Sequence, residues 1–177
     1  MTATRAAWNR AAVWHRRAAA AFVEALDAVP EEHWPLPLAA GKWTVGQLAE
    51  HIALSYSTAL EALAGGPGMR LVLPWWKVKF LRLTVLRRIL AGRGFPDGAP
   101  APREIRPGKT PAERAPAIAA LRALLVEIER ALAAAPPEWR LPHAYFGMLR
   151  PEQLLGVQAA HLDHHRRQLE RLLPAGA

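Results

Sequence analysis

The most informative stretch of this chain is His161-Leu162-Asp163-His164-His165, within the predicted helical segment from Gln153 to Leu173. His161 and His165 are four residues apart, so a helix places both imidazoles on one face, one turn from each other. The same face continues at helical spacing through Leu154, Gln158, Gln168 and Leu172, which is the pattern of a stripe that packs inward. A buried imidazole without a partner is costly, and HxxxH spacing suits a divalent metal, so both histidines are candidate ligands.

A third candidate ligand is His51, on the inward stripe of another predicted helix. That helix begins at Thr44-Val45-Gly46-Gln47, which has the form of a capping box, and ends at the glycines of residues 65–68. We expect His51 to meet His161 and His165, with their nearest ring nitrogens about 3–4 Å apart. His164 projects away from the pair, so we expect it at the rim of the site or beside a ligand.

Composition and length narrow the class of protein. The chain has 177 residues, of which 51% are hydrophobic, and this suits one domain spanning residues 1–177. It has no cysteine, which excludes disulfides, thiolate-bound zinc and a cysteine nucleophile. No uncharged apolar run approaches the ~20 residues of a transmembrane helix, and His15, Arg16 and Arg17 interrupt the one candidate signal segment. We therefore expect a cytoplasmic protein.

Three further helices are predicted, over residues 4–29, 74–91 and 110–135. The last begins at Thr110-Pro111-Ala112-Glu113, a second candidate capping box. The Gly- and Pro-rich loop from Gly92 to Gly108 is longer than most connections, so we expect it to border a cleft. No segment alternates like a β-strand. The chain is predicted to be all-α, with four or five helices and the two histidine-bearing helices adjacent.

The segment from Arg70 to Arg93 is rich in basic residues and contains no acidic residue. We expect its Trp75, Trp76 and Phe80 to pack at least partly against the bundle or a second subunit, because an exposed apolar patch is unusual. A membrane surface is the less favoured alternative. No nucleic-acid-binding motif accompanies the positive charge.

Two motifs together resemble the DinB/YfiT-like superfamily. The stretch from Trp43 to His51 is similar to its W-[ST]-x-x-[EQ]-[LI]-x-x-H motif, and His161 to Gln168 is similar to H-x-x-x-H-x-x-Q. The loop from His143 to Leu149 is similar to the H-P-x-F-G-x-L segment of an uncharacterised branch, although Ala144 replaces the proline and Arg150 replaces the Ser or Thr that follows it.

This resemblance implies a four-helix bundle, here with an additional short helix or insertion, that binds one divalent metal through His51, His161 and His165. The metal is zinc, or alternatively nickel, iron or manganese, since the ligand set alone does not choose. The relatives include thiol transferases that use low-molecular-weight bacterial thiols, a glutathione-linked isomerase and many members without known activity.

Three functional hypotheses follow. The first is a metal-dependent transferase or hydrolase with a small substrate, for which a thiol is one candidate, and in which a metal-bound water or thiolate is the reactive group. The second is a non-catalytic metal-binding module of a stress response, and the third is a membrane-surface protein. A homodimer is compatible with each. No Ser–His–Asp arrangement, phosphate loop or Rossmann motif is present.

The residues around the predicted metal define a candidate cleft. We expect the metal near one end of the bundle, at the level of His51, with a wall formed by residues 143–148. Tyr145 and Phe146 would supply an aromatic surface, and Gly147 would permit a tight turn. The remaining candidates for the cleft or for contact with a ligand are Trp43, His143 and His164. Glu50 and Asp163 adjoin ligands in sequence, but neighbouring residues on a helix point elsewhere, so we do not expect either to be a general base.

Overall fold

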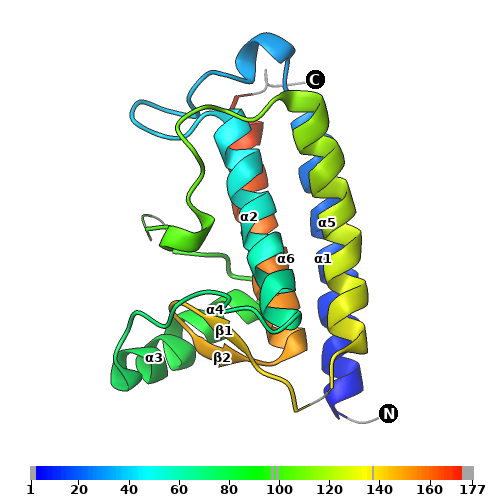
Figure 1. Ribbon diagram of the computed structural model, residues 1–177, viewed down its shortest axis with the longest axis vertical. Coiled ribbons are helices and arrows are strands. Elements are labelled where there is room, and N and C mark those ends of the chain that lie inside the picture. Colours follow the sequence, from blue (N-terminus) through cyan, green and yellow to red (C-terminus); the bar gives the residue numbers. More distant parts are fainter. Residues whose placement is uncertain (1–2, 97, 99, 137, 173–177) are drawn as a thin grey trace.

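Four long helices form the body of the protein. The computed structural model describes residues 3–96, 98, 100–136 and 138–172. The helices are α1 (Ala3–Asp27), α2 (Val45–Leu63), α5 (Arg114–Ala134) and α6 (Pro151–Glu170), and they lie side by side (Figure 1). α1 and α6 run in one direction and α2 and α5 in the other, so residues 64–113 must return along the length of the bundle (Figure 1). The predicted all-α bundle with an inserted helical segment is confirmed.

The core lies between these helices because each contributes one apolar stripe. α1 packs most extensively on α6, and α2 on α5. Large side chains from all four helices are fully buried, among them Phe22, Leu26, Leu48, Ile52, Leu121, Ile128, Leu155 and Leu162. Each such side chain contributes about 1.5–3 kcal/mol through its removal from water. None of the described helices has both the length and the apolar character needed to cross a membrane.

The start of α2 is set as the sequence predicts. The Thr44 hydroxyl accepts a hydrogen bond from the Gln47 amide at 3.1 Å, and the Gln47 side chain accepts one from the Thr44 amide at 3.0 Å. The second predicted capping box, at Thr110, is wrong. The Trp34 indole donates to the Ala112 carbonyl at 2.7 Å, residues 111–113 stay outside the helix, and α5 begins only at Arg114.

The inserted segment is a short broken helix. It consists of α3 (Trp75–Leu81), one wide π-helical turn η2 (Arg82–Leu86) and α4 (Arg87–Leu90). Its buried side chains Leu86 and Ile89 hold it to the bundle. Gly156 of α6 permits the close approach, since a Cβ there would lie 2.8 Å from the Leu90 side chain.

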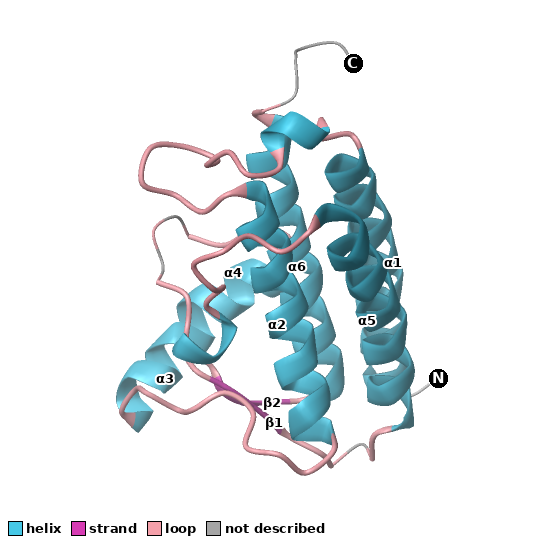
Figure 2. Ribbon diagram, turned by 45° about the horizontal axis from the view of Figure 1, so that its top comes forward, coloured by secondary structure: helices cyan, strands magenta, loops and turns pink. Residues whose placement is uncertain are grey.

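The aromatic residues of this segment were expected to pack against the bundle or a second subunit; the first alternative is wrong, and the second stays a prediction. Trp75, Trp76 and Phe80 are 76%, 55% and 62% exposed. The opposite side of the helix faces the protein, through Leu81 and Val85, which pack against the core. The aromatic face is therefore uncovered in the described chain, and α3 projects from the bundle in both views (Figures 1 and 2).

A β-hairpin precedes α6, although no strand is predicted. β1 (Leu141–His143) pairs antiparallel with β2 (Gly147–Leu149). Strands of three residues are too short for alternation to be visible in the sequence. Gly147 has φ +65°, which provides the predicted tight turn. The remaining helix ends lie within a few residues of their predicted positions, and the predicted end at Leu173 lies outside the described residues.

Candidate metal centre

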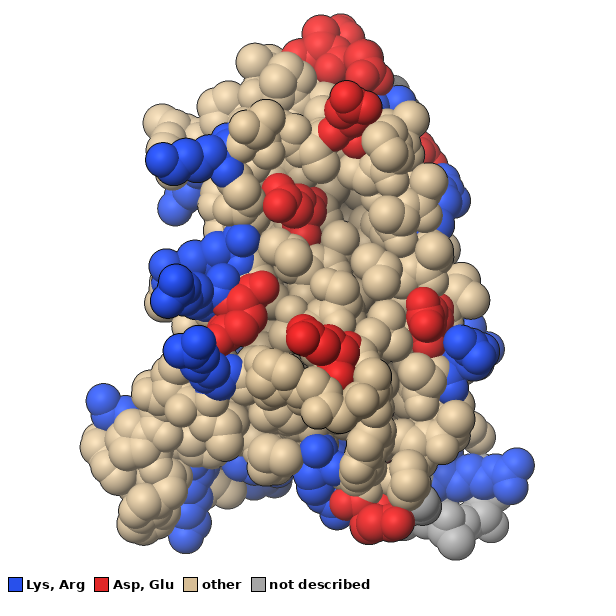
Figure 3. All heavy atoms as spheres, in the orientation of Figure 1, with Lys and Arg blue, Asp and Glu red and all other residues tan. Residues whose placement is uncertain are grey.

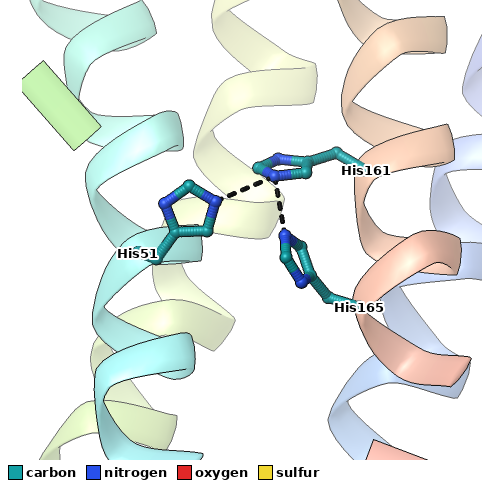
Figure 4. Close-up of side chains that lie close together, drawn as sticks. All are labelled: His51, His161 and His165. Atoms are coloured by element: carbon teal, nitrogen blue, oxygen red, sulfur yellow. Dashed lines mark hydrogen bonds between the residues drawn. The ribbon is translucent and has the colours of Figure 1, made fainter. Parts of the chain in front are cut away.

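The three candidate ligands converge between α2 and α6 (Figure 4). The Nε2 atom of His161 lies 3.0 Å from Nε2 of His51 and 3.0 Å from Nε2 of His165. All three candidate ligand nitrogens lie within 4.8 Å of one another. The convergence expected from helical spacing is therefore present in the fold.

The outer nitrogens of two of these rings have partners that determine where the hydrogens lie. Nδ1 of His51 lies 2.6 Å from the carbonyl oxygen of Ile105, at the end of the 3-10 helix η3 (Arg103–Ile105). A carbonyl only accepts, so Nδ1 of His51 is the donor. Nδ1 of His165 likewise lies 2.8 Å from Oε1 of Gln168. In the neutral state both rings therefore turn an Nε2 without hydrogen toward His161.

The facing nitrogens consequently have too few hydrogens to satisfy one another. Two of the three Nε2 atoms offer only lone pairs, and Nε2 of His161 can contribute at most one hydrogen. One cation can accept all three lone pairs, so the donor set fits a divalent metal. Nitrogens around a tetrahedral zinc are separated by roughly 3.4 Å, so an outward shift of a few tenths of an ångström would accommodate the ion.

Burial keeps these histidines in the neutral form that binds metal. It lowers the pKa of His51 to about 4 and that of His165 to about 3. The pKa of His161 lies well below its ordinary value, first because of burial and then because of the neighbouring imidazoles. A metal would therefore compete with little protonation at neutral pH.

Gln168 connects the centre to His164. Its Oε1 accepts from His165, and its side-chain nitrogen lies 3.2 Å from Nε2 of His164, to which it can donate. His164 is not among the converging ligands, and its ring lies beside Phe95. Gln168 thus orients one candidate ligand directly. The sequence motif includes this glutamine, but the motif alone did not indicate its role.

The first turns of α2 hold the loop that supports His51. The Gln47 side chain donates to the Gly108 carbonyl at 2.8 Å, and Glu50 accepts from the Gly108 amide at 3.2 Å. Glu50 therefore faces this loop. Asp163 accepts from the Trp14 indole at 2.8 Å. As expected from their positions, neither carboxylate belongs to the converging set.

A cavity of about 280 Å³ opens beside the three histidines. All five other residues expected to lie near the metal or line a cleft contribute to its wall: Trp43, His143, Tyr145, Phe146 and His164. The Trp43 ring lies 4.7 Å from that of His51, and the His143 ring stacks on Phe146 at 4.6 Å. Nδ1 of His143 accepts from the Tyr145 amide at 3.3 Å, which leaves its other nitrogen as the donor in the neutral ring.

The wall formed by residues 143–148 was expected at the level of His51. It lies instead near the end of α2. A Cβ on Gly68, just beyond α2, would lie 2.9 Å from Pro142, and the hairpin is drawn at the end of the bundle where α2 finishes (Figure 1). Pairing of β1 with β2 prevents this loop from folding back along α6. The cavity instead extends along the helices, from the histidines to the hairpin.

Other parts of the wall come from the crossover between α2 and α5. The predicted cleft-bordering loop supplies Phe95 and several of the residues that follow it, and the inserted helix supplies Leu81 and Val85. Ser55 and Gln158 also line the cavity, but they satisfy each other, with Gln158 donating to the Ser55 carbonyl at 3.1 Å. No lining residue in the described part of the chain is Lys, Arg, Asp or Glu.

Fold and site together define a helical bundle with an open three-histidine cluster. The chain belongs to the DinB superfamily, whose family model matches residues 15–169. It is also similar to the crystal structure of TT2238, described as a four-helix bundle protein, with a TM-score of 0.53 and 24% identity over 93% of this chain and 98% of that one. That likeness shows the fold alone. No curated protein matches the chain significantly.

Proposed function

We propose that the protein is a metal-dependent enzyme that acts on a small, uncharged and largely apolar substrate. This proposal rests on one observation. Three Nε2 atoms face one another with too few hydrogens to form hydrogen bonds among themselves, and they do so beside a cavity of about 280 Å³. A purely structural metal site is usually closed by protein ligands, whereas a catalytic one retains an open position.

The chain's own residues would hold the metal and shape the space beside it. His51, His161 and His165 would be the ligands, with zinc as the first candidate and nickel, iron or manganese as alternatives. When bound, such a metal supplies Lewis acidity that acidifies a water or a thiol in contact with it. The Ile105 carbonyl and Gln168 keep two of the ligand rings oriented.

His143 is proposed to orient the substrate rather than transfer a proton to it. Burial lowers the pKa of His143 to about 4, so the ring is neutral at pH 7. Its Nδ1 is engaged by the Tyr145 amide, and its remaining N–H can donate to an oxygen or nitrogen of a bound molecule.

The lining residues favour an uncharged substrate. A carboxylate entering the cavity would lose water without gaining a cationic side chain from the described wall. A neutral thiol or alcohol with an apolar body would instead place one polar atom at the metal and its remainder against Phe95 and Tyr145. Among thiols, this selects against those with several carboxylates.

Cobalt-loaded protein provides a direct test. Titration with a neutral thiol, benzyl mercaptan, should change the visible absorption of the cobalt at lower concentration than titration with glutathione. The variant Tyr145→Ala should retain cobalt but require more benzyl mercaptan. If neither thiol nor a small anion such as azide alters the spectrum, the coordination sphere is closed and the metal is structural.

A further inference from the structure

The inserted helical segment presents an uncovered apolar face to solvent. Trp76, Phe80 and Leu83 follow one another at helical spacing and are 55%, 62% and 57% exposed. Two apolar residues that precede α3 in sequence, Leu71 and Val72, are also 52% and 62% exposed. Contiguous exposed apolar surface of this kind is characteristic of an interaction site.

Positive charge surrounds the same face. Seven of the 23 Lys and Arg residues lie between Arg70 and Arg93 and none of the 15 Asp and Glu residues does, which leaves 16 basic and 15 acidic residues elsewhere. Nearly all of the net charge of +8 is therefore in this one segment. In Figure 3, the corner where α3 projects is tan with basic side chains at its margin and no acidic ones. Glu104, which approaches from η3, is paired with Arg70 at 3.7 Å.

The segment is anchored through its other face, so its outer face is available for a partner. Arg82 donates to the carbonyls of Phe146 and Met148 at 2.7 and 2.9 Å, which ties the insertion to the hairpin. Leu81 and Val85 line the cavity from the inner side of the same helix. An amphipathic helical segment with exposed aromatic side chains and flanking basic residues has the properties of an interfacial helix.

We propose that the face formed by residues 71–83 docks the protein on an anionic lipid bilayer. Tryptophan and phenylalanine would enter the headgroup region, while Lys77, Lys79 and Arg87 would contact anionic headgroups. A second copy of this chain fits less well. A twofold contact through this face would bring the basic segments of the two copies together, with no acidic residue in either segment to offset the repulsion. The cavity wall then lies directly behind the membrane-facing helix, where an apolar molecule could pass from the bilayer. This docking does not depend on the proposed enzymatic activity.

The test is flotation of the full chain with phosphatidylcholine vesicles, with and without phosphatidylglycerol. We expect binding to the anionic vesicles, weakened by salt, and little binding to the neutral ones. Reversal of Lys77, Lys79 and Arg87 to Glu should weaken binding by at least about tenfold. Arg82 is left intact because it holds the hairpin.

The matched control reverses Arg5, Arg10 and Arg17 to Glu, three exposed side chains of α1 that give the same change in net charge. It should bind nearly as the parent does. Replacement of the outer aromatic side chains, Trp76→Ser with Phe80→Ser, should also release the protein, whereas Val13→Ser with Val126→Ser, exposed elsewhere on the bundle, should not.

Three results would overturn the proposal. The first is no flotation with anionic vesicles, and the second is equal loss in the α1 control, which would show attraction by net charge alone. The third is a parent protein that does not bind vesicles but self-associates with increasing concentration in sedimentation, where Trp76→Ser with Phe80→Ser abolishes the self-association. That result would assign the face to a second copy.

Discussion

Replacement of Gln168 by Leu isolates the contribution of ligand orientation to metal binding. Gln168 accepts from Nδ1 of His165 at 2.8 Å, and this contact keeps hydrogen off the Nε2 atom that faces His161 and would bind the metal. Leu keeps a similar volume but removes the acceptor, so His165 is free to take the wrong tautomer or rotate. Loss of such a supporting contact typically lowers metal affinity 10–100-fold, and one hydrogen bond contributes about 0.5–1.5 kcal/mol. We expect zinc affinity to fall about 10–30-fold, which corresponds to about 1.4–2 kcal/mol.

Competition for zinc with a chromophoric chelator, at fixed neutral pH, measures this change. Gln168→Glu retains an acceptor for His165 and should bind zinc within a few fold of the parent protein. His164→Ala removes the second partner of Gln168 and a ring contact with His165, but none of the three candidate ligands, and should also retain zinc. Parental affinity in Gln168→Leu, or a loss in His164→Ala as large as in Gln168→Leu, would refute the assigned role of Gln168.

Three further outcomes are expected. Gly46→Ala should lower the melting temperature, because its Cβ would lie 2.7 Å from the Trp34 indole nitrogen and such overpacking costs about 1–3 kcal/mol. Gly156→Ala should lower it less, because the Cβ, at 2.8 Å, meets the flexible end of the Leu90 side chain, which can shift. The melting temperature of the metal-free protein should be highest above pH 6.5 and should fall as pH falls toward 4. Burial lowers the pKa of His15 to about 4, so in this interval the unfolded chain takes up a proton that the folded protein does not. A melting temperature independent of pH over this interval would contradict the burial of its histidines. Phe95→Ala should retain cobalt but bind benzyl mercaptan more weakly, as followed by absorption, and unchanged binding would remove Phe95 from the substrate wall.

Local periodicity was sufficient to predict that the two candidate ligands on α6 lie together. His161 and His165 share a helical face whatever else the chain does, and HxxxH spacing depends on no distant contact. His51 could be added because its own helix has a clear cap at Thr44 and a buried stripe. The same periodic pattern predicted four or five helices; four form the bundle, and the one predicted over residues 74–91 is the broken segment of α3, η2 and α4.

Contacts made by backbone atoms could not be predicted in the same way. The Ile105 carbonyl that orients His51 lies 54 residues away in sequence and carries no side-chain signal. The candidate cap at Thr110 had the right residue types, but the contact of Trp34 with the Ala112 carbonyl keeps that segment outside the helix. Propensity is a weak guide wherever such tertiary contacts compete with it.

The exposed face of α3 was mispredicted for a different reason. A large exposed apolar patch is unusual, and Trp76 and Phe80 were therefore expected to pack at least partly on the bundle or on a second subunit. Figure 2 shows α3 projecting away from the long helices. The contact with the core is made by Leu81 and Val85, on the other face of the segment. The pattern contained an amphipathic helix, but it could not indicate which face would meet the bundle.

The most direct test of the central claim is to measure the metal content of the untagged protein and of variants that lack one of the three candidate ligands. After dialysis against buffered zinc, elemental analysis should give one zinc per chain for the parent and for His164→Ala. It should give essentially none for His51→Ala or His161→Ala, with circular dichroism confirming that the variants remain helical. One bound metal in folded His161→Ala, or none in the parent under any divalent metal tested, would contradict the assignment of His51, His161 and His165 as a metal centre.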